Sequence, residues 1–353
     1  MDVEKKENRK IEIDLLRIVA CFSVIMLHSS AQYWYELPVS SLRWSVSNGY
    51  DALFRFGVPI FVMISGMLFL GREGEVKIKK LYSNNILRLA TCYVFWSCIY
   101  GLWDCRGWLG SLEVGWKTYV TEMILGRYHL WFVPMLIGIY MLLPVIKVFT
   151  DHCSKEQMEY FLLLFVIFQI GRGTLAILTI PKVAQVLVDL VDVEMACSYV
   201  GYFILGYYLV KYPPSLKAEK MLYLGGILSL PLAVLISNIA SLRAGEPRAE
   251  AFDSYSIFTF LVTAAIFVLF TKRLNKRKWK ERTARWIQAV SADTFGIYLV
   301  HVGLLELLQT KGIDSMTVDS VIGIPLLSVV TFLIGMVITA VLRRIPLLGR
   351  YLC

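Results

Sequence analysis

Residues 11–33 read IEIDLLRIVACFSVIMLHSSAQY, an apolar run long enough to cross a bilayer that nevertheless contains Asp14, Arg17 and His28. A charged side chain at the centre of a membrane helix costs about 2.5–3.5 kcal/mol on insertion scales, so such residues are usually paired or functional. In a helix, Arg17 and His28 are separated by three turns plus about 20°, and by about 16 Å along the axis. The two side chains therefore share one face, with Asp14 a turn before Arg17. The competing interpretation is that Arg17 and His28 merely reach toward the two headgroup layers.

The composition indicates a multispanning membrane protein. Of the 353 residues, 57% are hydrophobic, against about 45–50% in soluble domains. The basic start before residue 11 resembles a signal peptide, but the apolar run is too long and many more spans follow, so we expect a retained first helix. The pattern predicts an all-α polytopic membrane helix bundle of about ten transmembrane helices, forming one domain over residues 1–353. The ten spans are expected near 11–33, 47–70, 84–103, 130–149, 158–178, 195–211, 219–241, 254–271, 286–308 and 319–342.

The distribution of basic residues predicts the orientation. With the N-terminus inside, 25 of the 36 Lys and Arg residues lie in cytosolic segments, 8 in external segments and 3 within spans. The positive-inside rule therefore predicts that both termini are cytosolic. The net charge of +9 and the basic run 272–285 are then explained by a cytosolic loop beside anionic membrane lipids, and no nucleic-acid partner is expected. The seven cysteines show no metal-ligand spacing, so no metal site is expected.

Three of the four histidines fall in the outer part of this predicted bundle. His28 lies in the outer part of the first span, His129 begins the fourth and His301 lies in the outer half of the ninth, whereas His152 is cytosolic. Polar residues in a membrane face the bundle interior or a watery cavity by default. An imidazole can take a proton from an attacking hydroxyl or accept an acyl group, so His28 is the candidate catalytic residue. His129 and His301 are candidate substrate-binding residues, although an interfacial His129 and a satisfied core His301 remain open.

Three other charged residues have positions that favour ligand binding. Asp51 and Arg55, four residues apart, open the second span on the outer side and are candidate substrate-binding residues, with a local helix pair as the alternative. Arg88 enters the third span from the cytosolic side after three lysines, a placement suited to phosphate-bearing ligands and equally to positive-inside anchoring. The sequence contains no GxSxG, P-loop, HExxH or dinucleotide-binding motif, so no second catalytic architecture competes with histidine.

Four stretches in this order resemble the acyltransferase-3 membrane family. They are IDLLRIVACFSVIMLH at 13–28, VPIFVMISGMLFL at 58–70, HLWFVPMLIGIYMLLPVI at 129–146 and FGIYLVH at 295–301. The resemblance covers nearly the whole chain. It implies transfer of an acyl group, usually acetyl, from cytosolic acyl-CoA to a sugar or other hydroxyl at the outer face, with His28 as the catalytic residue and Arg17 as its paired arginine.

The segment NGYDALFRFGVPIFVMISG at 48–66 looks most like the branch of surface-polysaccharide O-acetyltransferases of the cell (plasma or inner) membrane. The resemblance implies acetyl-CoA as co-substrate and a surface glycan or lipid-linked sugar as acceptor. Arg17 and Arg88 are predicted to hold the acyl-CoA phosphates or the pantetheine entrance, because both lie in the inner part of the predicted bundle and arginine suits phosphate. One departure is that family members often carry Arg-x-x-Arg entering the third helix, whereas this chain has Asn85-Ile-Leu-Arg88.

Two other functions remain open at this stage. The family also resembles the membrane half of vancomycin-resistance serine racemases, so a transporter of a small polar solute such as serine is the alternative. Transporters commonly show repeated halves with paired broken helices, and none is evident in this sequence. A membrane anchor for a partner is the third reading, but it does not explain polar residues on one face of the first helix.

Overall fold

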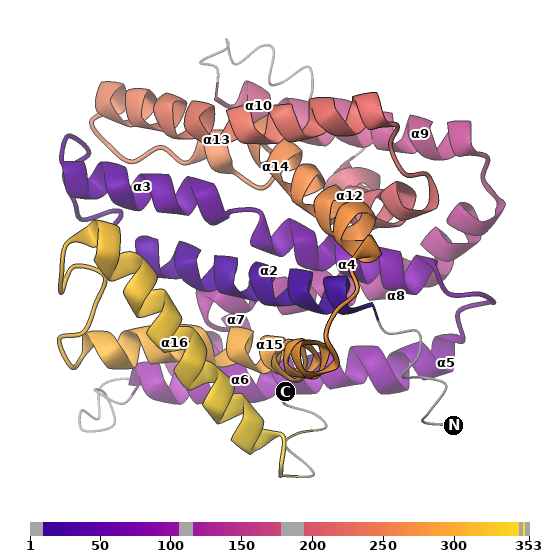
Figure 1. Ribbon diagram of the computed structural model, residues 1–353. Coiled ribbons are helices and arrows are strands. Elements are labelled where there is room, and N and C mark those ends of the chain that lie inside the picture. Colours follow the sequence, from indigo (N-terminus) through magenta and orange to yellow (C-terminus); the bar gives the residue numbers. More distant parts are fainter. Residues whose placement is uncertain (1–9, 106–115, 178–193, 346–348, 350–353) are drawn as a thin grey trace.

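The computed structural model describes residues 10–105, 116–177, 194–345 and 349, and the regular structure within them is helical (Figure 1). The expected all-α membrane bundle is therefore confirmed. The helices are α2 (Ile11–Ser30), α3 (Leu42–Phe54), α4 (Gly57–Leu70), α5 (Ile78–Leu81), α6 (Leu87–Cys105), α7 (Trp116–Leu125), α8 (Phe132–His152), α9 (Lys155–Leu164), α10 (Gly171–Leu175), α12 (Glu194–Lys211), α13 (Leu216–Ala244), α14 (Ile257–Val268), α15 (Glu281–Gln309) and α16 (Ser320–Leu342). Short π-helical or 3₁₀ turns lie at Tyr82–Ile86, Tyr128–Trp131, Phe165–Ile170, Glu250–Phe252, Leu269–Arg273 and Leu274–Lys276.

Helices occupy all ten stretches in which spans were expected. Within the described residues, eight helical segments are long and apolar enough to cross a membrane, and α2 and α12 are not among these eight. The count of ten spans therefore stays a prediction, as do the cytosolic termini, because residues 1–9 and 350–353 lie outside the described part. The eight segments are Leu42–Leu70, Ile78–Trp103, Tyr128–His152, Lys155–Leu175, Leu216–Ala244, Glu250–Lys276, Glu281–Gln309 and Ser320–Leu342.

The second expected span differs from the prediction in its start and its continuity. Its helix begins at Leu42, where the Ser41 hydroxyl caps the backbone N–H of Trp44 at 3.1 Å. The helix is then interrupted at residues 55–56, between α3 and α4. Proline has no N–H to give to the carbonyl four residues earlier, and its ring collides with that carbonyl. Pro59 therefore accounts for the break at Arg55.

Helix α2 runs through the middle of the bundle and packs against α3, α4, α15 and α16 (Figure 1). Its apolar residues Leu16 and Ile25 are fully buried. Its charged first turns are also covered by protein, because the buried Asp14 accepts a hydrogen bond from Ser291 of α15 at 2.8 Å. The interior of the bundle therefore shelters Asp14, one of the polar residues that made this helix unusual in the sequence.

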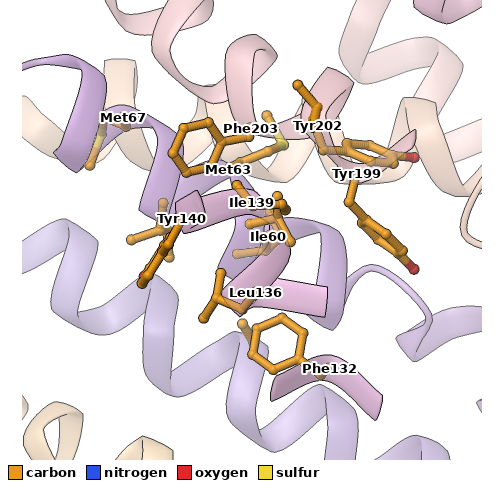
Figure 2. Close-up of a cluster of buried hydrophobic side chains, with 14 of the residues drawn as sticks. Ile60, Met63, Met67, Phe132, Leu136, Ile139, Tyr140, Tyr199, Tyr202 and Phe203 are labelled. Atoms are coloured by element: carbon orange, nitrogen blue, oxygen red, sulfur yellow. The ribbon is translucent and has the colours of Figure 1, made fainter. Parts of the chain in front are cut away.

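Helices α4 and α12 cross at very close range. A Cβ added to Gly66 would lie 1.7 Å from the carbonyl oxygen of Phe203, and one added to Gly206 would lie 2.1 Å from that of Met63. Small residues at a crossing let two membrane helices approach closely enough for extensive van der Waals contact. Figure 2 shows the resulting core, in which side chains of α4, α8 and α12 pack together. This packing fixes α8, whose leading turn carries His129.

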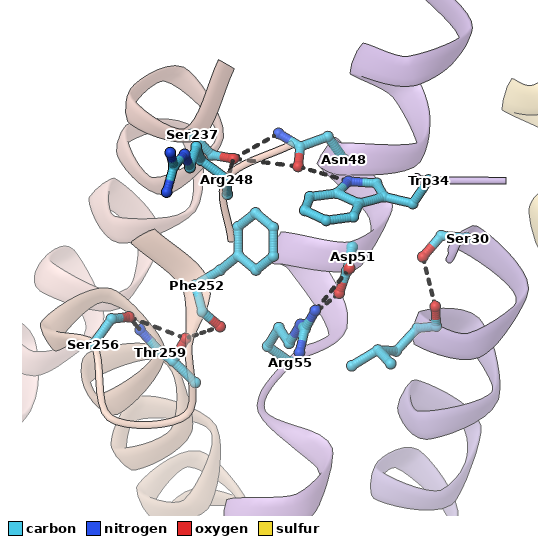
Figure 3. A network of polar contacts seen from close by, with 11 residues as sticks. Ser30, Trp34, Asn48, Asp51, Arg55, Ser237, Arg248, Phe252, Ser256 and Thr259 are labelled. Atoms are coloured by element: carbon cyan, nitrogen blue, oxygen red, sulfur yellow. Dashed lines mark hydrogen bonds and ion pairs between the residues drawn. The ribbon is translucent and has the colours of Figure 1, made fainter. Parts of the chain in front are cut away.

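A second polar network joins α3 to α13 (Figure 3). The amide of Asn48 donates hydrogen bonds to Ser237 at 3.1 Å and to Asn238 at 2.8 Å. The same amide accepts a bond from the indole of Trp34 at 3.1 Å. These bonds hold α3, and with it Asp51, against the rest of the bundle.

Candidate active site

Three histidines that are far apart in the sequence form one cluster. His28 lies in the last turn of α2, His129 in the 3₁₀ turn before α8 and His301 in α15. The centroid of the His301 ring is 5.0 Å from that of His28 and 5.2 Å from that of His129, and His28 and His129 are 6.5 Å apart. His129 and His301 are buried, whereas His28 is partly exposed. In this histidine cluster, His28 is thus the residue most open to a substrate.

The hydrogen bonding of His301 fixes which of its nitrogens carries a proton. Its Nδ1 lies 2.5 Å from the backbone carbonyl oxygen of Tyr298, one turn earlier in α15. A carbonyl oxygen only accepts, so Nδ1 is the N–H of the neutral ring and Nε2 keeps a free lone pair. Nε2 is buried and has no hydrogen-bond partner in the described part of the chain. Buried polar atoms usually have a hydrogen-bond partner. This nitrogen is therefore suited to accept a hydrogen bond from a donor group within the site.

Two tyrosines hold the histidine-bearing segments together. The hydroxyl of Tyr298 donates to the carbonyl of His129 at 2.5 Å, which ties α15 to the turn before α8. The hydroxyl of Tyr100 in α6 donates to the carbonyl of Leu299 at 2.8 Å and accepts from the N–H of Gly303 at 3.1 Å. Both tyrosines were missed in the sequence analysis. Tyr298 could have been found, because it stands three residues before His301 in the FGIYLVH stretch.

Asp51 and Arg55 form a bidentate ion pair beside the histidine cluster. Arg55 donates from Nε and Nη2 to the two carboxylate oxygens of Asp51 at 2.5 and 2.8 Å (Figure 3). The guanidinium also lies over the ring of Phe252, 5.1 Å from its centroid, and interacts electrostatically with His28. The carboxylate is buried while 28% of the Arg55 side chain is exposed. The helix pair named as an alternative is therefore present, and Arg55 is the member open to a ligand.

A second ion pair lies on the other flank of the cluster. Arg127, directly before the 3₁₀ turn that carries His129, pairs with Glu306 of α15. The same guanidinium lies 5.9 Å from the ring centroid of Tyr128. Tyr128 in turn packs edge-on against His28, with ring centroids 5.5 Å apart. The accessible histidine therefore sits among aromatic rings and paired charges.

A cavity of about 370 Å³, which we call the inner cavity, extends from Arg17 and Arg88 toward this cluster. Arg17 is 3.3 Å from Asp14, and Arg88 is exposed at the start of α6. The opposite part of the cavity is lined by Phe132 and Tyr298, whose rings are 5.6 Å apart. The Tyr298 ring in turn lies 5.8 Å from the rings of both His129 and His301. One cavity thus joins the two arginines to the wall behind the histidine cluster.

A family model described as an acyltransferase domain matches residues 10–342. The chain belongs to the acyltransferase-3 family. Searches among curated proteins and among solved structures found no match. Together with its apolar helices, the family match makes this chain a multi-pass membrane acyltransferase.

All the predicted site residues of this acyltransferase lie inside the matched range, in two groups. The inner group is Arg17 and Arg88, which line the same cavity although 71 positions separate them. The outer group comprises the three clustered histidines with Arg55, while the oxygens of Asp51 are engaged by Arg55. Within the described residues, no three His, Cys, Asp or Glu side chains are arranged to hold a metal ion.

Proposed function

We propose that this acyltransferase, acting as one unit over its whole length in the cell membrane, transfers an acetyl group from acetyl-CoA to a hydroxyl of a surface glycan or lipid-linked sugar. The supporting observation is that the inner cavity begins at two arginines and ends at Tyr298, one ring away from the histidine cluster. Transport of a solute such as serine needs no such juxtaposition of a phosphate-binding end with an imidazole cluster.

The inner cavity has the chemistry of a site for the arm of acyl-CoA. Guanidinium groups bind phosphates through several N–H donors in a fixed geometry, so Arg17 and Arg88 are assigned to the phosphates. The cavity is also lined by the amides of Asn84 and Asn85, about one turn before Arg88, and by the aromatic ring of Tyr140. Polar donors and acceptors suit the amides of the pantetheine arm, while the rings suit its methylene groups. The thioester would then lie beside Tyr298, near the histidine cluster.

His28 is the proposed base. It takes the proton from the acceptor hydroxyl as the hydroxyl oxygen attacks the thioester carbonyl; the carbon–sulfur bond then breaks and the departing thiolate of CoA receives a proton. Transfer through an acyl-His28 intermediate would take two steps. The imidazole nitrogen first attacks the thioester carbonyl, the carbon–sulfur bond breaks, and the departing thiolate takes the ring proton. The acceptor hydroxyl oxygen then attacks the acyl carbon, the carbon–nitrogen bond breaks, and the freed imidazole takes the hydroxyl proton.

The outer polar residues are assigned to the acceptor. A sugar presents several hydroxyls, each able to donate and to accept a hydrogen bond. The partly exposed guanidinium of Arg55 provides donors, the buried carboxylate of Asp51 holds it in place, and the ring centroid of His129 lies 6.5 Å from that of His28. These three residues therefore form the proposed acceptor-binding side of the site.

Arg88→Ala should raise the KM for acyl-CoA roughly 10-fold or more, because a charge-assisted hydrogen bond to phosphate contributes about 1.5–3 kcal/mol. The KM for the acceptor should stay within about twofold of the wild-type value, since Arg88 lies at the far end of the inner cavity. Steady-state kinetics of the purified protein measures both constants. Lys79→Ala, which removes an exposed charge from α5 outside the cavity, is the matched control. A raised acceptor KM with unchanged acyl-CoA saturation contradicts the assignment.

His301 has two possible roles in this proposal, and one variant separates them. It was first predicted to bind substrate, but its buried Nε2 can instead accept the N–H of His28 after a small rotation of the rings, leaving the other His28 nitrogen free as a base. His301→Ala should then lower kcat by about 10–100-fold, the effect of removing a residue that orients a metal-binding histidine. Both KM values should stay unchanged. His301→Gln, which keeps an acceptor oxygen, should recover part of kcat. A raised acceptor KM with unchanged kcat would identify His301 as substrate-binding.

A further inference from the structure

A separate cavity of about 320 Å³ opens where the first turn of α2 meets the ends of α4 and α12 and the helical turns after α14. It shares no lining residue with the inner cavity. In the predicted orientation, all four of these helix ends face the cytosol. Its volume falls within the range of about 300–1,000 Å³ that is usual for small-molecule sites.

Glu12 presents an unsatisfied acid to this cavity. The residue is only 5% exposed, and its Oε1 has no hydrogen-bond partner in the part of the chain that the structure describes. A buried carboxylate without a partner is costly, and buried charges in proteins are normally paired. A ligand that fills the cavity with a group bearing N–H donors and positive charge would satisfy it.

The opposite charge is available from lysines in the same lining. Lys272 is already engaged, since its Nζ donates to Glu219 at 2.7 Å and to the carbonyl of Pro214 at 2.6 Å. Lys10 and Lys276 also line the cavity, and no ion pair joins either of them to an acid among the described residues. Two ammonium groups that could pair with an anion thus line the same cavity as the Glu12 side chain.

Much of the remaining lining is apolar, including Met67, Leu209 and Val210, and Thr271 and Asn275 add two polar side chains. An amphipathic cavity between the ends of membrane helices, with basic residues at its rim, is the arrangement that binds phospholipid headgroups at a cytosolic face. A polar soluble ligand would gain little from the apolar side chains, whereas the glycerol and first methylenes of a lipid would pack against them.

We propose that this cavity binds a phospholipid whose headgroup carries a primary ammonium, with phosphatidylethanolamine as the fitting case. Its phosphate lies between Lys10 and Lys276, and its ammonium donates to the free oxygen of Glu12. A choline headgroup has the same charge but no N–H to donate, and a glycerol headgroup has no cation. The site therefore distinguishes headgroups by the hydrogen bond to Glu12.

The test measures binding of dioctanoyl lipids to the full chain in detergent by native mass spectrometry. The wild-type protein should bind phosphatidylethanolamine about 10-fold or more tightly than phosphatidylcholine, which is the effect of one hydrogen bond between charged groups. Glu12→Gln should bring the ethanolamine lipid down to the level of the choline lipid and leave the latter unchanged. Lys276→Ala should weaken both. Lys278→Ala, an exposed neighbour outside the lining, should weaken neither.

Several results would overturn the proposal. Equal binding of the two lipids, or a preference that survives Glu12→Gln, excludes recognition of the ammonium. Binding of soluble glycerophosphoethanolamine as tightly as the lipid would make the occupant a soluble molecule. Because Glu12 is buried, size-exclusion chromatography checks that Glu12→Gln is folded; the exposed Lys276→Ala provides the second readout if it is not, and unchanged binding in Lys276→Ala excludes the site.

Discussion

His28→Ala should lower the rate of acyl transfer by about 10²–10⁴-fold, the usual effect of removing a general base. His28 is the partly exposed member of the histidine cluster, whereas His129 and His301 are buried. The fold should survive, because the His28 ring forms no side-chain hydrogen bond within the described residues, whereas Tyr298 and Tyr100 join the surrounding segments. Consumption of acyl-CoA by the purified protein, measured through the released thiol, gives the rate.

The fourth histidine provides the matched control for this prediction. His152 is exposed at the end of α8 and its Nδ1 lies 2.9 Å from the carbonyl of Val148. His152→Ala removes an imidazole without touching the cluster, so its rate should match that of the wild type. Thermal unfolding of both variants checks that they are folded. If His28→Ala retained more than half of the wild-type turnover, His28 would be neither base nor acyl acceptor.

Transfer in sealed vesicles of one orientation should require acyl-CoA on the cytosolic face and acceptor on the external face. His28 lies 17 residues after Ile11, or about 25 Å along an ideal helix, within a hydrocarbon core of about 30 Å. The inner cavity leads from Arg17 and Arg88 toward the same point from the opposite side. Only the acyl group would pass between compartments, while the charged nucleotide stays beside Arg88. With either substrate on the wrong face, transfer should fall to background.

Permeabilised vesicles are the control, because each substrate then reaches both faces and every arrangement should give the same rate. Proteolysis at residues 277–280, the non-helical part of the basic run 272–285, reports which face is outward and so tests the predicted orientation independently. Equal transfer with both substrates on the cytosolic side of intact vesicles would refute the two-sided site, even if His28 proved essential.

The helices could be predicted because the length of an apolar run can be read from the local sequence. The family could be predicted because its motifs are short continuous stretches. The same holds for the ion pairs Asp14–Arg17 and Asp51–Arg55, whose members lie one turn apart on a single helix. The predicted topology placed the three histidines at a similar level, and the structure brings their rings together. The break at residues 55–56 was missed, although Pro59 provided a local signal for it.

Which side of one helix faces another helix could not be predicted in this way. His28 and His301 are 273 positions apart, and their depth alone does not state that α2 and α15 turn these rings toward each other. That direction depends on tertiary contacts such as the bond from Cys21 Sγ to the carbonyl of Thr294 at 3.4 Å. Tyr100 was missed for the same reason, since nothing distinguishes it among 19 tyrosines until α6 packs on α15.

The bond between Asp14 and Ser291 has a consequence for how the protein is made. The two residues are 277 positions apart, so a ribosome that adds about 5–20 residues per second needs roughly 14–55 s to supply the serine after the aspartate. During this interval, Arg17 on the same helix can already pair with Asp14. We therefore expect Arg17→Ala to lower the fraction of newly made chains that insert correctly, beyond any effect on acyl-CoA, and pulse-labelling with protease protection would measure it. Unchanged insertion would mean that Arg17 acts only in the folded enzyme. Lowered insertion would give Arg17 two roles: it pairs with Asp14 while α2 inserts into the membrane, and it binds acyl-CoA in the folded enzyme.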